Sequence, residues 1–227
     1  MYTLCIANKN YSSWSLRPWV LMRALDIDFA EQLLPFEAGS NYQRFRRFAP
    51  NGKVPCLLDA GVAIWDSLAI TEYLAERHAG VWPQDPAARA WARCAAAEMH
   101  AGFSALRDRC SMSCGVRVRL RETPPDLQQD LARIEELWNE GLQRFGGPFL
   151  AGAAFTAVDA FYAPVAFRIQ TYGLALAGRA AAYVPQLLEQ APMRQWYDEA
   201  LRETWRDEAH EAHTRLMGET LHDYRAA

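Results

Sequence analysis

The chain has 227 residues, 51% of them hydrophobic and 22% charged, and its formal net charge is -3. This length suits one large domain or two small ones, and the composition is that of a folded globular protein, which excludes a disordered or disulfide-stapled chain. The mild acidity argues against binding to nucleic acid or to a membrane surface, either of which needs a basic face.

The first third of the chain alternates strand-like and helix-like segments. We expect a strand at residues 2–7, a buried helix at 16–25 and a second strand at 28–36. Residues 54–66 are typical of two short strands around an Asp-Ala-Gly turn, and the helix signals that follow end at Gly80. A β-α-β unit followed by a β-β-α unit predicts a small mixed sheet with helices packed on it, in a domain of residues 1–80.

The second part of the chain is predicted to be an all-helical domain, residues 86–227, after a linker at 80–86 that contains two prolines. No strand is expected in it. Alanine-rich composition or helical spacing of apolar residues predicts helices, at 87–110, 126–145, 155–174 and 192–204.

Two segments of this part carry charged residues without a clear motif. Residues 113–122, with Arg117, Arg119 and Arg121 at alternate positions, form either a cationic patch for anionic ligands or a solvated loop, and we favour the loop. The tail, residues 206–227, is expected to be a surface segment, because its "HEAH" is one residue short of the zinc-protease pattern.

The cysteines and the amino terminus bear on the compartment. The five cysteines have no CxxC pair and no zinc spacing, so we expect reduced thiols in a cytoplasmic protein and no metal site. "YTLCIA" follows Met1 without a basic segment, and no apolar run reaches the roughly 20 residues of a membrane span, so we expect neither a signal peptide nor a membrane anchor.

Ser12, Ser13 and Ser15 stand where the first strand leads into the first helix. A helix start carries unpaired N–H groups and a partial positive charge. One serine therefore either caps the helix while the others fill a loop, or the hydroxyls bind an anionic ligand there. Taken alone, this segment favours the cap.

Two further segments favour a ligand. Pro55 directly precedes a strand, where a cis Val54-Pro55 bond would turn backbone groups outward to meet an extended peptide. Asp66 and Ser67 open another helix, where the N–H groups can bind a carboxylate and the acid an ammonium. Together the three segments predict a cradle for a peptide with an α-amino acid end.

These three segments, with "FLAGAAFTAVDAFYAP" in the helical part, resemble the cytosolic glutathione transferase family over nearly the whole chain. The resemblance implies a thioredoxin-like domain followed by an all-helical domain. Val54-Pro55 matches the family's cis-proline motif, and Asp66-Ser67 matches the pair that binds the γ-glutamyl group of glutathione. Thr156 and Asp159 match the family's helix-capping box.

Within the family, "YSSWSLRPW" resembles the serine-type members and is closest to the zeta-class motif. Aligned on Arg17, the first motif serine falls on Ser12, and Trp14 takes the place of the motif cysteine. Ser12 is therefore the candidate catalytic residue, as a hydrogen-bond donor to the glutathione thiolate, with Ser13 as the alternative. The residues expected to bind glutathione are Ser13, Trp14, Lys53, Val54, Pro55, Asp66 and Ser67.

The roles of neighbouring residues are less sharply defined. Lys53 either meets the glycine carboxylate of glutathione or is simply solvated, and Arg17 is expected to be an ion-pair partner within the fold. Trp14 would narrow the pocket for the second substrate. We expect that substrate between the domains, near residues 100–115, Arg168 and Tyr172.

The predicted function is transfer of glutathione, used as a co-substrate, to a small hydrophobic electrophile, in a homodimer. One alternative is a zeta-like cis-trans isomerase of the maleylacetoacetate type. Trp14 counts against it, as does Thr171, which stands where a substrate-binding arginine is expected, with Arg168 about one turn earlier. The other alternative is a non-catalytic binding module, which would have no need of a complete peptide cradle.

Overall fold

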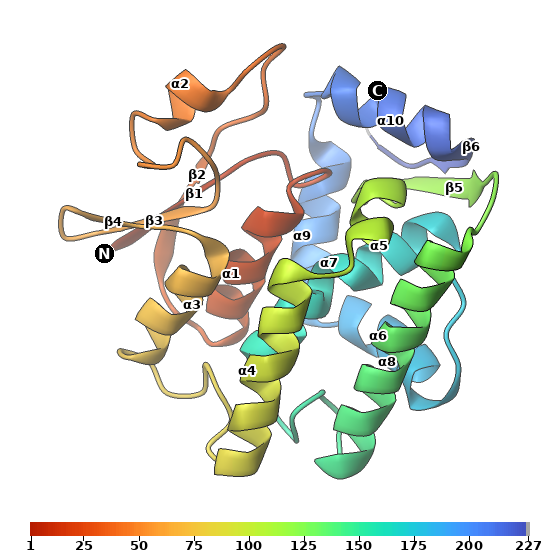
Figure 1. The fold of residues 1–227 in the computed structure, drawn as a ribbon. Coiled ribbons are helices and arrows are strands. Elements are labelled where there is room, and N and C mark those ends of the chain that lie inside the picture. The colour runs from red at the N-terminus through yellow and green to blue at the C-terminus, as the bar shows by residue number, and fades with distance from the viewer. Residues whose placement is uncertain (226–227) are drawn as a thin grey trace.

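The computed structural model describes residues 1–225. Figure 1 shows the first 75 residues as a small sheet with helices, lying beside a larger group of helices formed by the rest of the chain. Within the described residues, no helix combines the length and the apolar character that crossing a membrane requires.

The amino-terminal part contains a four-stranded mixed sheet in the order β2-β1-β3-β4. β1 (Tyr2–Ile6) pairs in parallel with β2 (Phe29–Leu33) and antiparallel with β3 (Cys56–Asp59), which continues antiparallel to β4 (Val62–Ile64). The predicted β-α-β and β-β-α units are confirmed. Their helices are α1 (Ser13–Ala24) and α3 (Ser67–Ala75), which ends before Gly80, and the short α2 (Tyr42–Phe45) lies between β2 and β3.

The rest of the chain is mainly helical, as predicted. The predicted 87–110 helix is interrupted at Gly102 and Phe103, and Phe103 has a left-handed φ of 57°. The sequence patterns did not predict the helices at 178–188 and 208–217. The helices are α4 (Pro86–Ala101), α5 (Ser104–Arg109), α6 (Pro125–Arg144), α7 (Ala157–Tyr172), α8 (Gly178–Leu188), α9 (Ala191–Arg202) and α10 (Glu208–Met217).

The expectation that no strand follows residue 86 is wrong. β5 (Val116–Leu120) pairs antiparallel with β6 (Gly218–Asp223), so residues 113–122 are not a solvated loop and the tail is not a plain surface segment. Val116 and Val118 are buried, whereas Arg117 is half-buried and Arg119 is exposed. This alternation has the two-residue period of a strand with one buried face. Figure 1 shows the β5-β6 pair beside α10.

Helix α7 is the centre of the core. Every residue of it except Gln170 is buried, and it packs against α1, α4, α8 and β5. The predicted capping box at its start is confirmed: the backbone N–H of Thr156 donates to the Asp159 carboxylate at 2.9 Å. The same carboxylate accepts the Tyr183 hydroxyl at 2.6 Å, which fixes α8 against α7.

The two parts share one continuous hydrophobic cluster, because α1 packs against α7 and α9. Between α3 and α4, residues 76–85 contain no helix or strand, and Val81 in this segment is buried and accepts the Ala157 N–H at 2.8 Å. The domain boundary predicted at residues 80–86 stays a prediction.

Candidate active site

The loop between β1 and α1 is held in place by residues of α9 and just beyond it. Lys9 is buried, lies 2.7 Å from Glu31 on β2 and forms a second ion pair with Glu199 on α9. The backbone N–H groups of Lys9 and Asn10 donate to the two carboxylate oxygens of Glu203 at 2.6 Å and 3.1 Å. The position of the following serines is therefore set by side chains about 190 residues away.

Ser12 occupies the position before α1, yet its side chain does not cap the helix. Its hydroxyl donates instead to Ser15 Oγ at 2.7 Å, and Ser15 Oγ accepts the backbone N–H of Ala7 at 3.3 Å. Ser12 therefore does not play the part of the capping serine that the first alternative requires. The positive end of α1 has neither a side-chain cap nor an acidic residue in its first turn, so it can interact with an anion.

Ser13 differs from Ser12 in its partner. Arg168 Nη2 lies 3.4 Å from Ser13 Oγ and donates to it, so the proton of the Ser13 hydroxyl remains available to another acceptor. Ser13 is also half-buried, whereas Ser12 is buried.

The opposite wall of the site consists of the segments that sequence reasoning selected. The Val54-Pro55 peptide bond is cis, as predicted. Asp66 caps α3 by accepting the Leu68 N–H at 3.0 Å, and its second oxygen lies 3.3 Å from His100 Nε2. Ser67 is fully buried, and its hydroxyl has no hydrogen-bond partner in the described part of the chain.

Two adjoining cavities bring most of the predicted residues together. The larger has a volume of about 490 Å³, and Ser12, Ser13, Lys53 and Val54 all line it. The smaller, of about 240 Å³, is lined by Trp14, Asn51, Lys53, Val54, Pro55 and Asp66. Trp14, Lys53 and Val54 line both cavities, whereas Ser67 lines neither.

Arg17 contradicts the expectation of an ion pair. It is buried between aromatic rings, with its guanidinium carbon 4.3 Å from the ring centre of Trp14 and 4.8 Å from that of Phe161. Within residues 1–225, its Nε and Nη1 atoms have no hydrogen-bond partner. Burial, followed by repulsion from Arg107 and Arg168, lowers the pKa of Arg17, so a nearby anion would be favoured electrostatically.

Two guanidinium groups line the larger cavity. Arg107, in α5, lies over the Trp14 ring at 4.7 Å and donates to the carbonyls of Met99 and His100. Arg168, in α7, donates to the carbonyl of Cys110 at 2.8 Å, and burial, with Arg107 as the next cause, lowers its pKa to about 10. Neither forms a salt bridge with a carboxylate of residues 1–225.

The expected location of the second substrate is only partly matched by the cavity. Arg168 lines it, together with Arg107, Ser111 and Met112 from the predicted 100–115 region. Tyr172 does not line it, because the Tyr172 hydroxyl donates to the carbonyl of Ser111 at 3.0 Å.

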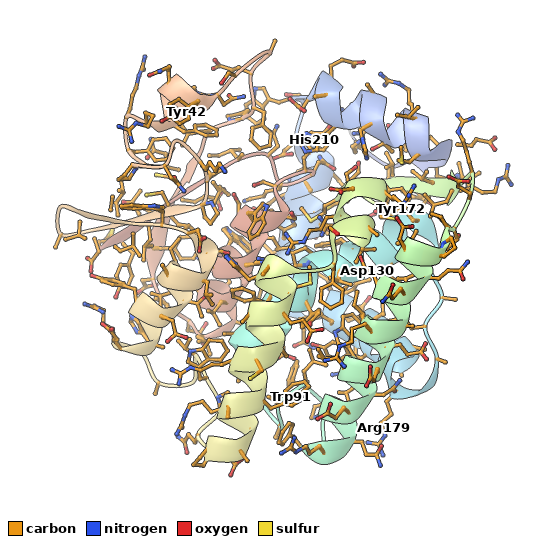
Figure 2. The ribbon with its side chains drawn as sticks, viewed as in Figure 1. Tyr42, Trp91, Asp130, Tyr172, Arg179 and His210 are labelled. Atoms are coloured by element: carbon orange, nitrogen blue, oxygen red, sulfur yellow. The ribbon has the colours of Figure 1, made fainter. Side chains whose placement is uncertain are left out.

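Sequence reasoning missed the remaining wall of the cavity. It consists of aromatic residues near α1 and α2 and of His210 from α10; these residues are Tyr11, Phe36, Tyr42, Phe45 and His210. Figure 2 labels Tyr42 and His210 at the same end of the molecule. The sequence signal for His210 is the Asp207-x-x-His210 spacing of a capped helix start, which does not by itself place the ring beside the serines.

The thiols near the site are not nucleophiles. Burial raises the pKa of Cys110 to about 12 and that of Cys56 to about 11, so both stay protonated at neutral pH. Residues 1–225 contain no group of three or more side chains arranged to hold a metal ion.

Residues 11–77, which include every predicted site residue, match the family model described as the glutathione S-transferase amino-terminal domain. The whole fold resembles that of a glutathione transferase homologue from Burkholderia solved with bound glutathione, with a TM-score of 0.66 and 18% identity, over 88% of this chain and 97% of that one. The amino-terminal part of the chain therefore matches the glutathione S-transferase amino-terminal domain, and the fold of the whole chain is similar to that of a solved glutathione transferase homologue.

Two curated relatives share sequence with the chain. A probable maleylacetoacetate isomerase from Caenorhabditis elegans is 34% identical over 99 residues, which are 42% of this chain and 45% of the relative. The maleylacetoacetate isomerase of Rattus norvegicus is 26% identical over 155 residues, 67% of this chain and 70% of the relative. The match therefore spans less than half the length of the nematode protein.

Proposed function

We propose that the chain is a glutathione S-transferase, which activates the glutathione thiolate for attack on a small hydrophobic electrophile. The observation that carries this proposal is the shared cavity: Ser12 and Ser13 at the start of α1 face the same space as Lys53 and Val54. Glutathione would lie along the Lys53–Asp66 wall, with its sulfur over the start of α1. Lys53 is exposed there and can approach a carboxylate without losing its hydration.

The energy needed to activate the thiol is within reach of these groups. A free thiol of this kind has a pKa of about 8.5, and lowering it by roughly two units requires about 2.7 kcal/mol. One hydrogen bond to a charged acceptor contributes about 1.5–3 kcal/mol, and a helix start about 0.3–1 kcal/mol. A serine hydroxyl at the uncapped end of α1 is therefore sufficient without a general base.

We propose Ser12 as the hydroxyl donor, as the sequence motif suggests. Its proton, now donated to Ser15, reaches the sulfur by rotation about the Cβ–Oγ bond, and Ser15 then retains the Ala7 N–H as its partner. Ser13 is the second candidate, because Arg168 already occupies one lone pair of its oxygen and leaves its proton free. The buried cations of Arg17 and Arg168 favour the thiolate in either case.

The test combines binding to immobilised glutathione with conjugation of an aryl halide. The wild-type protein is expected to be retained and to conjugate the halide, and Ser12→Ala to be retained with lower activity at neutral pH. Ser104→Ala is the matched control, since Ser104 is exposed and lines neither cavity. Absence of retention would contradict the proposal and favour a non-catalytic module.

A glutathione-dependent cis-trans isomerase is the second candidate. It is favoured by the two relatives that are named as isomerases and by Arg107 and Arg168, whose guanidinium groups line the cavity and could accept an acidic substrate. Isomerisation returns glutathione unchanged, whereas transfer consumes it. Incubation with a cis-unsaturated dicarboxylate, while free thiol is measured, therefore separates the two activities.

We also propose a cytoplasmic homodimer, in which the small domain of one protomer meets the helical domain of the other. The dimer is proposed from the family resemblance. The five free cysteines suit a reducing compartment. Light scattering on the purified protein tests the dimer, and a mass of one chain, about 25.7 kDa, would contradict it.

A further inference from the structure

His210, in the first turn of α10, is held by stacking contacts with two aromatic rings. The ring stacks on Tyr11 with centroids 5.0 Å apart and an interplanar angle of 23°, and on Phe36 at 5.7 Å and 17°. Tyr11 belongs to the loop that carries the serines, so α10 and the serine loop are coupled through this ring. Since His210 also lines the larger cavity, its free edge borders the space proposed for the second substrate.

Asp207 determines which nitrogen of His210 is available. Its Oδ2 atom lies 2.6 Å from His210 Nδ1 and also accepts the backbone N–H of His210 at 3.0 Å. A carboxylate only accepts hydrogen bonds, so Nδ1 carries a proton and donates to it. Nε2 has no hydrogen-bond partner in residues 1–225, and it is the atom that can exchange a proton with a ligand.

Thiolate chemistry divides into two types by the fate of the negative charge. In substitution at an aryl halide, the charge departs with the halide ion. In addition to an α,β-unsaturated carbonyl, the S–C bond forms while the C=C π electrons move onto the carbonyl group as an enolate. Only the second type leaves a strong base in the cavity, and it therefore needs a proton donor.

We propose that His210, held by Asp207, is a catalytic acid for addition of glutathione to α,β-unsaturated carbonyl compounds; this rests on the proposed transferase function. The imidazolium Nε2–H gives its proton to the enolate, and the saturated adduct forms. Solvent, which received the proton of the glutathione thiol, protonates the imidazole again. Atoms and charge balance, and no oxidant or reductant is consumed.

The surroundings of His210 are suited to this step. Arg107 and Arg168 line the same cavity without carboxylate partners, so they favour negative charge developing on the carbonyl oxygen. Charged and titratable groups surround His210 on several elements. Its own helix and cap contribute Asp207, Glu211 and His213, and the serine loop contributes Tyr11. The others are Arg107, Asp108, Arg168 and Arg225.

The alternative is that His210 only clamps α10 against Tyr11 and Phe36. His210→Phe separates the two roles, because phenylalanine keeps the stacking but has no proton to donate. The readout is the ratio of the addition rate with an enone to the substitution rate with an aryl halide. A proton donor contributes about 10²–10⁴-fold, so we expect this ratio to fall about 10²-fold or more. His222→Phe, on exposed β6, is the matched control.

A second variant changes the support of His210 and leaves its ring in place. Asp207→Asn keeps an acceptor for the α10 cap but removes the carboxylate that holds the proton on Nδ1, so the ratio of the addition rate to the substitution rate should fall in this variant as well. This variant tests the proposal even if His210→Phe does not fold.

The outcomes separate this inference from the function on which it rests. If the wild-type protein conjugates neither substrate, the proposed function is wrong and the inference falls with it. If it conjugates both, but His210→Phe and Asp207→Asn keep the ratio of rates, only the inference is overturned.

Discussion

Glu203 binds Asn10 twice: one carboxylate oxygen accepts the backbone N–H of Asn10 at 3.1 Å and its side-chain amide at 3.2 Å. The other oxygen accepts the Lys9 N–H at 2.6 Å. Lys9, Asn10 and Glu203 are all buried. A residue just after α9 therefore holds the loop that leads to the serines at the start of α1, and the geometry of the candidate site depends on the helical part as well as on the sheet.

Replacing Glu203 is expected to damage both stability and binding. Glu203→Ala leaves three buried N–H donors without an acceptor, which should lower the free energy of unfolding by about 3–5 kcal/mol. Glu203→Gln keeps one acceptor oxygen and should lower it less. Urea denaturation and glutathione titration measure the two effects. Glu122→Ala, at an exposed position, should change stability by less than about 0.5 kcal/mol. Equal losses in the three variants would contradict this role of Glu203.

Arg17 is expected to lower the free energy of unfolding while it favours the thiolate of bound glutathione. A buried cation without a carboxylate partner is costly, so Arg17→Met should be neutral or stabilising by about 1–2 kcal/mol. The same change removes a positive charge near the start of α1 and should raise the pKa of bound glutathione. Thermal denaturation and thiolate titration check both expectations. A loss of stability above about 2 kcal/mol would show that the guanidinium group has favourable partners.

His100 is expected to make stability depend on pH. Burial lowers its pKa, Asp66 opposes this shift, and Arg17 and Arg107 add to it. Because the folded-state pKa lies below the unfolded value of about 6.5, the unfolded chain binds more protons between the two values. Stability should therefore fall as pH decreases from about 6.5 to the folded-state pKa and change no further through this group.

The His100 expectation is checked by urea denaturation at several pH values. His100→Gln should flatten the decline below about pH 6.5. His222→Gln, which alters an exposed histidine of β6, is the control and should leave the decline as it is. An identical decline in the wild-type protein and His100→Gln would assign it to other groups.

Local sequence patterns predicted the features that arise from neighbouring residues. The alternation of strands and helices in the first 80 residues and the Thr156–Asp159 capping box depend on spacing of one to four residues, and the structure confirms both. The cis Val54-Pro55 bond was predicted from proline before a strand and from the family motif.

The features that were missed depend on contacts between distant parts of the chain. Val116 and Val118 alternate with arginines as in a strand, but their partner strand begins at Gly218, so nothing nearby in the sequence indicated the pairing. Arg17 was expected to have an acidic partner, yet it packs between Trp14 and Phe161, an arrangement that only the folding of α1 against α7 creates.

The central claim, that a serine hydroxyl at the start of α1 stabilises the glutathione thiolate, is tested most directly by titrating the ultraviolet absorbance of bound thiolate. In the wild-type protein the pKa should lie roughly two units below the free value of about 8.5, and Ser12→Ala should raise it by about one to two units. Ser13→Ala should raise it less. An unchanged pKa in both variants would contradict the account.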